Sequence, residues 1–287
     1  HEGLSHNTVY SVLEDNQGYM WFSTENGLSL LINKKEKQDT SAQSRFINFT
    51  RQDGLKGLNF YTNAAIIDSK NRIWWGSGKA LTMLDRDEFS LPETAPRIHL
   101  RSIRIDQHHI DYRHFARQQK TDSGNLASVI DFAKQVKPAE IQKLGKISFT
   151  GVSRFSNYPK NLKLPYNLNH LSFQFAAIEW NAPHKIQYRY KLEGLDQSWS
   201  RTTSEAKADY RNIPYGQYTF KAQARGVSGK WSQPLSYSFV ITPPWWHTWW
   251  ARVAYVLIGL LVVLGYIRWR IAKLKKRQKE LQHLVNE

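Results

Sequence analysis

Apolar and polar residues alternate along four segments in the second half of the chain. These segments are residues 171–177, 186–192, 218–224 and 235–241. Gly194, Pro214 and Gly226 begin or belong to the turns between them. Because a period of two places every second side chain on the same face of a strand, the pattern predicts antiparallel strands with one buried and one solvated face.

A fifth segment, residues 98–105, has the same alternation with one irregularity. The apolar residues before and after Arg101–Ser102 are out of phase by one position. A β-bulge, which inserts one extra residue into a strand, would explain this shift. Together the five segments predict a β-sandwich over residues 96–242.

Helical spacing interrupts the alternation between Ser123 and Gly145. Apolar residues recur there every three or four positions, at Leu126, Val129, Ile130, Ala133 and Val136. Pro138 suits the first turn of a second short helix, and Gly145 suits its end. Residues 123–145 are therefore predicted to form a helical insertion in the sandwich.

The most apolar run of the chain extends from Trp249 to Ile267 and is interrupted only by Arg252. Its length is close to the roughly 20 residues that a helix needs to cross a bilayer. A buried core helix is the alternative, but such a helix usually carries polar residues on one face. Tryptophans flank the run like the aromatic belts of membrane helices, at Trp245, Trp246, Trp249, Trp250 and Trp269. The pattern predicts a transmembrane helix over residues 249–267.

Basic residues follow this run directly. The chain has a net charge of +16, and residues 268–287 contain seven Lys or Arg and two Glu. The positive-inside rule places residues 268–287 in the cytoplasm and residues 1–242 outside it. Anionic lipid then accounts for the basic cluster, so no nucleic acid is expected as a partner of this region.

Apolar residues in the basic tail repeat every three or four positions. The predicted seam consists of Ile271, Leu274, Gln278, Leu281 and Val285. This heptad spacing is typical of a coiled coil, and one polar seam residue can fix register and oligomer number. We expect residues 268–287 to be a dimeric coiled-coil linker that continues beyond Glu287 towards an output domain.

Two stretches near the N-terminus resemble each other. Asp15 and Trp21 in the first correspond to Asp68 and Trp74 in the second, each at an offset of 53 residues. An Asp carboxylate can hold the backbone of a turn, Gly18 or Asn71 can adopt a positive φ there, and the tryptophan would then enter the next strand as a core residue. Short strands around such turns are typical of propeller blades, although a free-standing β-meander is an alternative.

Residues 3–85 resemble the two-component regulator propeller repeat, through the Gly-Leu, Asn, Asp, Gly and Trp positions of the first copy. The second copy matches less closely, because Asn71 replaces Gly18 and Ala80 replaces Gly27. The resemblance implies that residues 1–95 are the last blades of a β-propeller. Two blades cannot close a propeller, so we expect further blades before residue 1.

A second resemblance covers residues 162–250. Tyr188, Tyr190 and the segments 192–199, 210–218 and 243–249 resemble the three-tyrosine (Y_Y_Y) domain of bacterial membrane sensors. The family implies an immunoglobulin-like fold between regulator propellers and a transmembrane helix. The structural motif residues expected from the two resemblances are Trp21 and Trp74 in the propeller repeats and Tyr188, Tyr190, Trp199, Tyr218 and Trp231 in the sandwich, where Trp199 and Trp231 are expected to close the core or its rim. Trp180 stands where the family more often has tyrosine, and Tyr215 stands where it usually has proline.

Little in the sequence indicates catalysis. The chain has no cysteine, which excludes disulfides, Cys-ligated metals and a thiol nucleophile. His108 and His109, with nearby Asp106, Asp111 and His114, are the one cluster resembling a metal site, but neighbouring residues on a strand point to opposite faces. The alternative is that these side chains are simply exposed on a strand–turn–strand segment. No catalytic residue, cofactor or metal is therefore predicted, and the chain is not expected to be an enzyme.

The expected fold class is mostly β, with partial propeller blades, an immunoglobulin-like sandwich, one transmembrane helix and a short coiled coil. The family order implies a dimeric sensor in a bacterial inner membrane. Residues 1–242 would be periplasmic and would sense a small ligand, with a glycan as one candidate class, and the output would be a histidine kinase or a diguanylate cyclase. The alternative is a membrane-anchored carbohydrate-binding module of a surface enzyme, which would have no need of the heptads.

Overall fold

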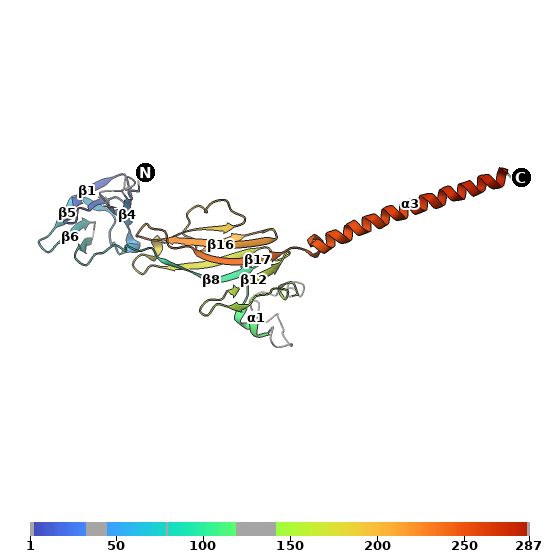
Figure 1. Cartoon of the computed structure of the whole chain (residues 1–287). Coiled ribbons are helices and arrows are strands. Elements are labelled where there is room, and N and C mark those ends of the chain that lie inside the picture. Colours follow the sequence, from blue (N-terminus) through green and yellow to red (C-terminus); the bar gives the residue numbers. More distant parts are fainter. Residues whose placement is uncertain (1–2, 33–44, 79, 119–141, 286–287) are drawn as a thin grey trace, which may run out of the picture.

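The computed structural model describes residues 3–32, 45–78, 80–118 and 142–285, with residues 118 and 276–285 as backbone. Small β-sheets occupy the N-terminal end, a β-sandwich follows, and one long helix projects from the far end of the sandwich (Figure 1). The mostly β fold class is thereby confirmed.

Two N-terminal sheets pack against each other. The first has four antiparallel strands in the order β1 (Val9–Glu14), β2 (Met20–Thr24), β3 (Gly27–Ile32) and β4 (Arg45–Phe49). The second has three, β5 (Phe60–Ile67), β6 (Arg72–Ser77) and β7 (Ala80–Asp85), and a short 3-10 helix η1 (Arg51–Asp53) connects the two sheets.

The repeated Asp and Trp residues have the same structural role in both sheets. The Asp15 carboxylate accepts hydrogen bonds from the backbone N–H of Gln17 and Tyr19, each at 3.0 Å, and from the indole N–H of Trp21 at 2.9 Å. Asp68 accepts the equivalent bonds from two backbone N–H groups and from the Trp74 indole at 3.0 Å. The prediction that each Asp holds its turn is confirmed.

The prediction that both repeated tryptophans are core residues is correct for Trp21 only. Trp21 is 2% exposed and packs on Trp75, with ring centroids 5.5 Å apart, whereas Trp74 is half-buried. Alternation along β6 turns Trp75 towards the first sheet and Trp74 to the opposite face, beside the exposed Ile66 and Met83. Trp21 thus faces the second sheet, whereas Trp74 faces away from the first sheet. Of the two side chains, only that of Trp21 is covered by described residues.

The sandwich consists of two four-stranded sheets. The first has the strand order β12 (Leu162–Pro165), β17 (Leu235–Thr242), β16 (Gly216–Arg225) and β14 (Gln187–Glu193). The second has the order β15 (Lys207–Tyr210), β13 (Leu171–Ile178), β8 (Arg97–Ile105) and β9 (His108–His109), and the short β10 (Gly151–Val152) and β11 (Pro159–Lys160) form a separate pair. All of these pairings are antiparallel except β12 with β17.

The alternation in the sequence defines the sandwich core. Phe173 on β13 and Phe220 on β16 stack across the two sheets with ring centroids 4.1 Å apart, and both are fully buried. The predicted bulge is present in β8, where Ser102 pairs with Gln174 and Leu100 with Phe175, which leaves Arg101 without a pairing partner. The bulge returns Ile103 and Ile105 to the inner face, so all five predicted strands are confirmed.

The helical insertion differs from its prediction at the N-terminal side. A helix α1 (Tyr112–Gln118) begins before the predicted range and directs Tyr112 and Phe115 into the core. The expected strand–turn–strand around the histidines is present as β8, a turn at residues 106–107 and β9, and the chain then continues as helix α1. The predicted helical residues from Leu126 to Val136 lie outside the described residues.

The last helix, α3 (Trp249–Val285), is continuous over 37 residues. Its backbone includes the predicted membrane span and the predicted linker as far as Val285. A 3-10 turn η4 (Trp245–His247) joins it to β17.

Candidate functional site

The structure connects three parts of the chain through two junctions, and these junctions form the candidate site. The first junction joins the N-terminal sheets to the sandwich, and the second joins the sandwich to α3 (Figure 1).

Asp53 lies at the centre of the first junction. Its carboxylate, with 7% of the side chain exposed, lies 2.5 Å from the Lys185 ammonium and 3.1 Å from Nε2 of His184. Both partners belong to η3 (Pro183–Lys185) of the sandwich. Asp53 also accepts the backbone N–H of Thr50 at 2.8 Å, which completes a capping box around η1. Burial alone would raise the pKa of Asp53, but the hydrogen bonds from Lys185 and Thr50 outweigh it and hold that pKa below its ordinary value.

A second contact at this junction involves the loop after β16. The Arg45 guanidinium donates a hydrogen bond to the carbonyl of Val227 and lies where a Cβ on Gly229 would be. Val227 N–H donates to both oxygens of Glu179, at 3.2 and 3.3 Å. Burial, followed by the charge of Arg225, lowers the pKa of Arg45. Glu179 therefore positions the loop that receives Arg45.

Apolar side chains from the N-terminal sheets and from the sandwich also pack together at the first junction. Ala182 and Val227 of the sandwich are buried in one cluster with Leu55, Phe60 and Trp75 of the N-terminal sheets. The Lys185 ammonium also lies 4.4 Å from the ring centroid of Phe49. Because apolar packing and ion pairs act over the same small area, the two parts are held in one relative position.

The tyrosines of the sandwich take part in packing and hydrogen bonding within the domain. Tyr188 is 5% exposed, and its hydroxyl accepts the backbone N–H of Ala177 at 3.2 Å. Tyr218 covers Gly194 and donates to the carbonyl of Pro214 at 3.0 Å, as in the tyrosine corner of immunoglobulin-like domains. Tyr190 is half-buried against Tyr210, and burial, followed by the nearby Glu205 and Asp196 carboxylates, raises its pKa.

Trp199 and Trp231 lie at the surface of the sandwich and are absent from its buried core. The guanidinium carbon of Arg189 is 4.8 Å from the ring centroid of Trp199 and 4.2 Å from that of Trp231. Arg225 stacks on Trp231 from 4.9 Å. These cation–π contacts form a layered surface on β14 and β16.

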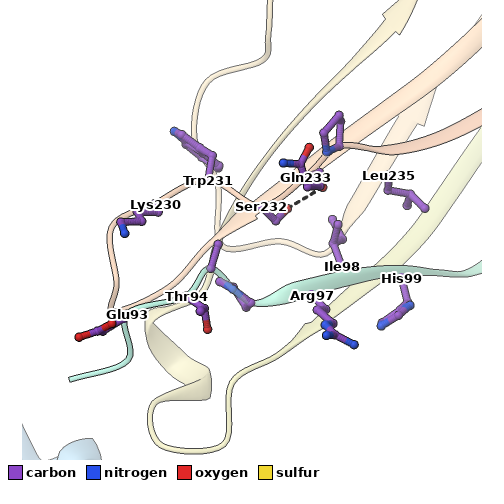
Figure 2. A pocket seen from close by; sticks show the side chains of 13 residues that line it. Glu93, Thr94, Arg97, Ile98, His99, Lys230, Trp231, Ser232, Gln233 and Leu235 are labelled. Carbon is purple, nitrogen blue, oxygen red and sulfur yellow. Dashed lines mark hydrogen bonds between the residues drawn. The ribbon is translucent and has the colours of Figure 1, made fainter. Parts of the chain in front are cut away.

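Two open grooves flank the segment that leads into β8. The first, of about 640 Å³, is lined by residues 93–99 and 230–235, with Trp231, Lys230 and Arg97 among them (Figure 2). The second, of about 510 Å³, is lined on one side by residues 178–181. In it Trp180 exposes 88% of its surface, so this position carries an aromatic side chain without using it for packing.

The second junction brings together three of the predicted membrane-interface tryptophans, Trp245, Trp246 and Trp250, whereas Trp269 lies farther along α3 beside Tyr266. Trp245, Trp246, Trp249, Trp250 and Trp269 expose between 38% and 77% of their surface. Trp245 contacts Trp246 and Trp250, with ring centroids 5.7 and 6.2 Å apart. In α3 the segment Trp249–Lys275 is long and apolar enough to cross a membrane, and almost none of it is buried in the protein.

Of the predicted dimer seam, the structure describes the side chains of Ile271 and Leu274, which are 47% and 55% exposed. The side chains of Gln278, Leu281 and Val285 lie outside the described part, although the helix backbone continues to Val285.

The histidine cluster does not gather into a metal site. His108 and His109 are consecutive on β9 and pair with different residues of β8. His108 lines a small polar cavity with Asp106, Lys143 and His170. Within the described residues, no group of three or more His, Asp or Glu side chains could hold a metal ion.

Comparisons with known proteins support both resemblances. Residues 181–242 match the family model of the Y_Y_Y domain, and residues 3–26 match that of the two component regulator propeller. The second repeat lies outside the propeller match, although its Asp68–Trp74 bond repeats that of Asp15–Trp21.

The chain is 26% identical over 281 residues to a protein named Histidine kinase P4 from Formosa agariphila. That alignment covers 96% of this chain and 17% of the kinase. A crystal structure described as the extracellular domain of a hybrid two component system from B. thetaiotaomicron has the same fold, with a TM-score of 0.57 at 20% identity over 84% of this chain and 27% of that one. The chain thus resembles the extracellular and membrane-proximal part of two-component-type sensors and spans a small fraction of their length.

Proposed function

We propose that this chain is the extracytoplasmic relay and membrane anchor of a dimeric inner-membrane sensor. Residues 1–242 lie in the periplasm, and occupancy of a ligand site in the full protein changes the position of the sandwich. Helix α3 carries that change to a histidine kinase or diguanylate cyclase domain elsewhere in the full protein. The chain itself performs no catalysis in this proposal.

One observation carries the proposal: the last strand of the sandwich runs into the apolar helix with only six residues between Thr242 and Trp249. Pro243 and Pro244 restrict the backbone in this connection, and the η4 turn follows them immediately. A displacement of β17 would therefore reach α3 without being absorbed by a long flexible linker.

The topology is tested with reporter fusions in a bacterium. Alkaline phosphatase, which is active only outside the cytoplasm, should be active when fused after Thr242 and inactive when fused after Glu287. The reverse pattern would exclude the proposed orientation.

The relay is tested by changing the phase of α3 in the full-length protein. Insertion of two alanines after Arg270 rotates everything beyond them by about 200°, whereas insertion of seven restores the phase to within about 20°. The two-residue insertion should lock or abolish the output, and the seven-residue insertion should retain a ligand-dependent output. Equal outputs from the two variants would mean that the helix only anchors the protein.

The alternative function is a membrane-anchored carbohydrate-binding module. The exposed indole of Trp180 beside a shallow groove favours it, because sugar rings stack on such apolar faces. If this function is correct, Trp180→Ala should abolish retention of the protein on polysaccharide, and both helix insertions should have no effect.

A further inference from the structure

Two tyrosines on separate loops of the sandwich lie beside the segment that leads into the membrane helix. Tyr166 follows Pro165, which pairs with Thr242, the last residue of β17. Tyr215 precedes Gly216, which pairs with Ile241. The strand register therefore places both side chains at the end of the sandwich from which α3 leaves (Figure 1).

Both tyrosines contact the connecting segment. The Tyr166 ring packs edge-on against Trp246, with centroids 5.2 Å apart, and the Tyr215 ring lies 5.7 Å from His247. The two loops and the η4 turn thus form one surface, which we call the aromatic edge and define as Tyr166, Tyr215, Trp245, Trp246 and His247.

The aromatic edge is exposed in the protein by itself. Tyr166 is 39% exposed, Tyr215 is 48% exposed and Trp245 is 62% exposed. Soluble surfaces seldom gather large aromatic side chains at one end of a domain, and such a patch usually marks an interaction site. Tyrosine and tryptophan, which combine an apolar body with a polar tip, are the side chains that concentrate where lipid meets water.

The chain itself identifies what covers this surface. The apolar segment Trp249–Lys275 begins two residues after His247, so wherever α3 crosses a bilayer the aromatic edge lies at that bilayer's surface. We propose that the aromatic edge is a lipid-binding surface, through which the sandwich rests directly on the outer interface of the membrane. The inference rests on the proposed membrane crossing of α3 and adds to it that two loops of the folded domain, not the helix alone, contact lipid.

This contact gives the sandwich a defined orientation on the membrane. A domain attached only through the segment after Thr242 would have no second contact with the membrane to oppose its tilting. With Tyr166 and Tyr215 in the interface on two different loops, tilting the sandwich requires moving an aromatic ring into or out of the headgroup layer. The aromatic edge therefore converts a tilt of the sandwich into a displacement at the start of α3.

The test measures lipid contact in the full chain, inserted into vesicles of phosphatidylethanolamine and phosphatidylglycerol. The chain has no cysteine, so single cysteines can carry a fluorescent label at Tyr166→Cys, Tyr215→Cys, Gln233→Cys and Val256→Cys. Gln233 is exposed near the start of β17, at the opposite end of the sandwich, and Val256 is exposed within the predicted span. Nitroxide groups on the lipids, either near the headgroup or deep in the acyl chains, quench labels at the corresponding depth.

We expect the shallow nitroxide to quench labels at positions 166 and 215 at least threefold more than the label at position 233, and the deep nitroxide to quench position 256. If position 256 is quenched and positions 166 and 215 behave like 233, the lipid-binding surface is wrong while the membrane crossing stands. If position 256 is not quenched, the membrane crossing itself is wrong.

A label at Gln217→Cys keeps both tyrosines in place and gives a second readout close to the same edge. Gln217 is exposed and adjacent to Gly216. Shallow quenching there should exceed that at position 233 and should fall towards it in the Tyr166→Ser, Tyr215→Ser double variant. The same quenching at positions 217 and 233 with both tyrosines present would overturn the proposal.

Discussion

Replacement of Asp53 by alanine should loosen the N-terminal sheets from the sandwich without unfolding either part. The change removes an ion pair with Lys185 at 2.5 Å and a contact with His184 at 3.1 Å, on a side chain that is 7% exposed. Hydrogen bonds to a charged partner at such sites contribute about 1.5–3 kcal/mol. Loss of the capping box at Thr50 adds about 1 kcal/mol. Lys185 retains its position over the Phe49 ring, which offsets part of the loss by roughly 0.5–1 kcal/mol.

The free energy of opening this junction should therefore fall by about 1.5–3.5 kcal/mol, which corresponds to a roughly 10- to 400-fold change in an equilibrium constant. Hydrogen exchange on the full chain measures it at the amides of Asp53 and Lys185, which bond to the carbonyls of Thr50 and Ala182. Lys185→Met should have a similar effect, and the double variant should cost less than the sum of the two single variants. Lys230→Met is the matched control, because Lys230 is exposed on the same side of the sandwich and forms none of the described ion pairs.

The same junction should weaken in acid. The pKa of Asp53 is lowered in the folded protein, so its contribution is fully present above the unfolded-state value of about 4 and disappears as the pH falls through the folded-state value. Exchange at the two amides should therefore accelerate below about pH 4 in the native protein and much less in Asp53→Ala. A change of less than threefold in exchange at neutral pH for both Asp53→Ala and Lys185→Met would refute the assignment of this contact as the connection between the two parts.

Three further predictions concern the rest of the chain. Gly229→Ala should disrupt the second contact of the first junction, because φ is +73° at this position and the added Cβ would meet the Arg45 guanidinium. Proteolysis between residues 86 and 97 should therefore be faster in Gly229→Ala than in the control variant Ser228→Ala. Burial alone would raise the pKa of Asp209, but hydrogen bonds from Ser172, His170 and Arg211 outweigh burial and lower that pKa to about 2. The free energy of unfolding of the native chain should therefore approach that of Asp209→Asn as the pH falls from about 4 to 2. A difference between the two that stays constant over this range would contradict the prediction. Oxidation of membranes should crosslink dimers through cysteines at Leu274 or Leu281 but not at Lys279, and equal crosslinking at all three would mean that the tail has no defined seam.

The strands of the sandwich were predictable because their signal is local. In β13 and β16, every second residue is apolar and points into the core, so the pattern needs no knowledge of distant partners. The bulge at Arg101 was predictable for the same reason, since one extra residue in a strand shifts the phase of its apolar positions by one. The turn role of Asp15 and Asp68 followed from the repeat itself.

Helix α1 was missed although a signal for it exists. The helix has seven residues, too few for apolar periodicity to show, and among its described side chains only Tyr112 and Phe115 enter the core. The signal is Asp111, whose carboxylate accepts the backbone N–H groups of Arg113 and His114 at 3.0 and 3.1 Å, as an N-cap residue does. The burial of Trp75 instead of Trp74 depends on which face of β6 meets a neighbouring sheet, and this is a property of the array that alternation within one strand cannot reveal.

The junctions were beyond prediction for a different reason. Asp53 and Lys185 are far apart in the sequence, and each by itself is an ordinary charged residue beside a turn. Tyr166 and Tyr215 likewise occur in loops with no shared pattern, and only the pairing of β12 and β16 with β17 brings them to one edge. Local pattern identified the parts of this chain, whereas the contacts between the parts required the register of strands that are distant in sequence.

From the N-terminal sheets to α3, these contacts limit which part of the proposed relay can change conformation. The N-terminal sheets are held to the sandwich by Asp53 and by a shared apolar cluster, and β17 is paired on both sides by β12 and β16. After the short connection of six residues, the aromatic edge constrains the start of α3. By contrast, a coiled-coil pair of about two heptads is marginal in water, because the apolar area that it buries scarcely exceeds the cost of ordering it. If the protein works as proposed, ligand occupancy therefore acts where the least free energy is needed, in the pairing of the cytoplasmic part of α3, and variants that stiffen this pairing should fix the output while leaving ligand affinity almost unchanged.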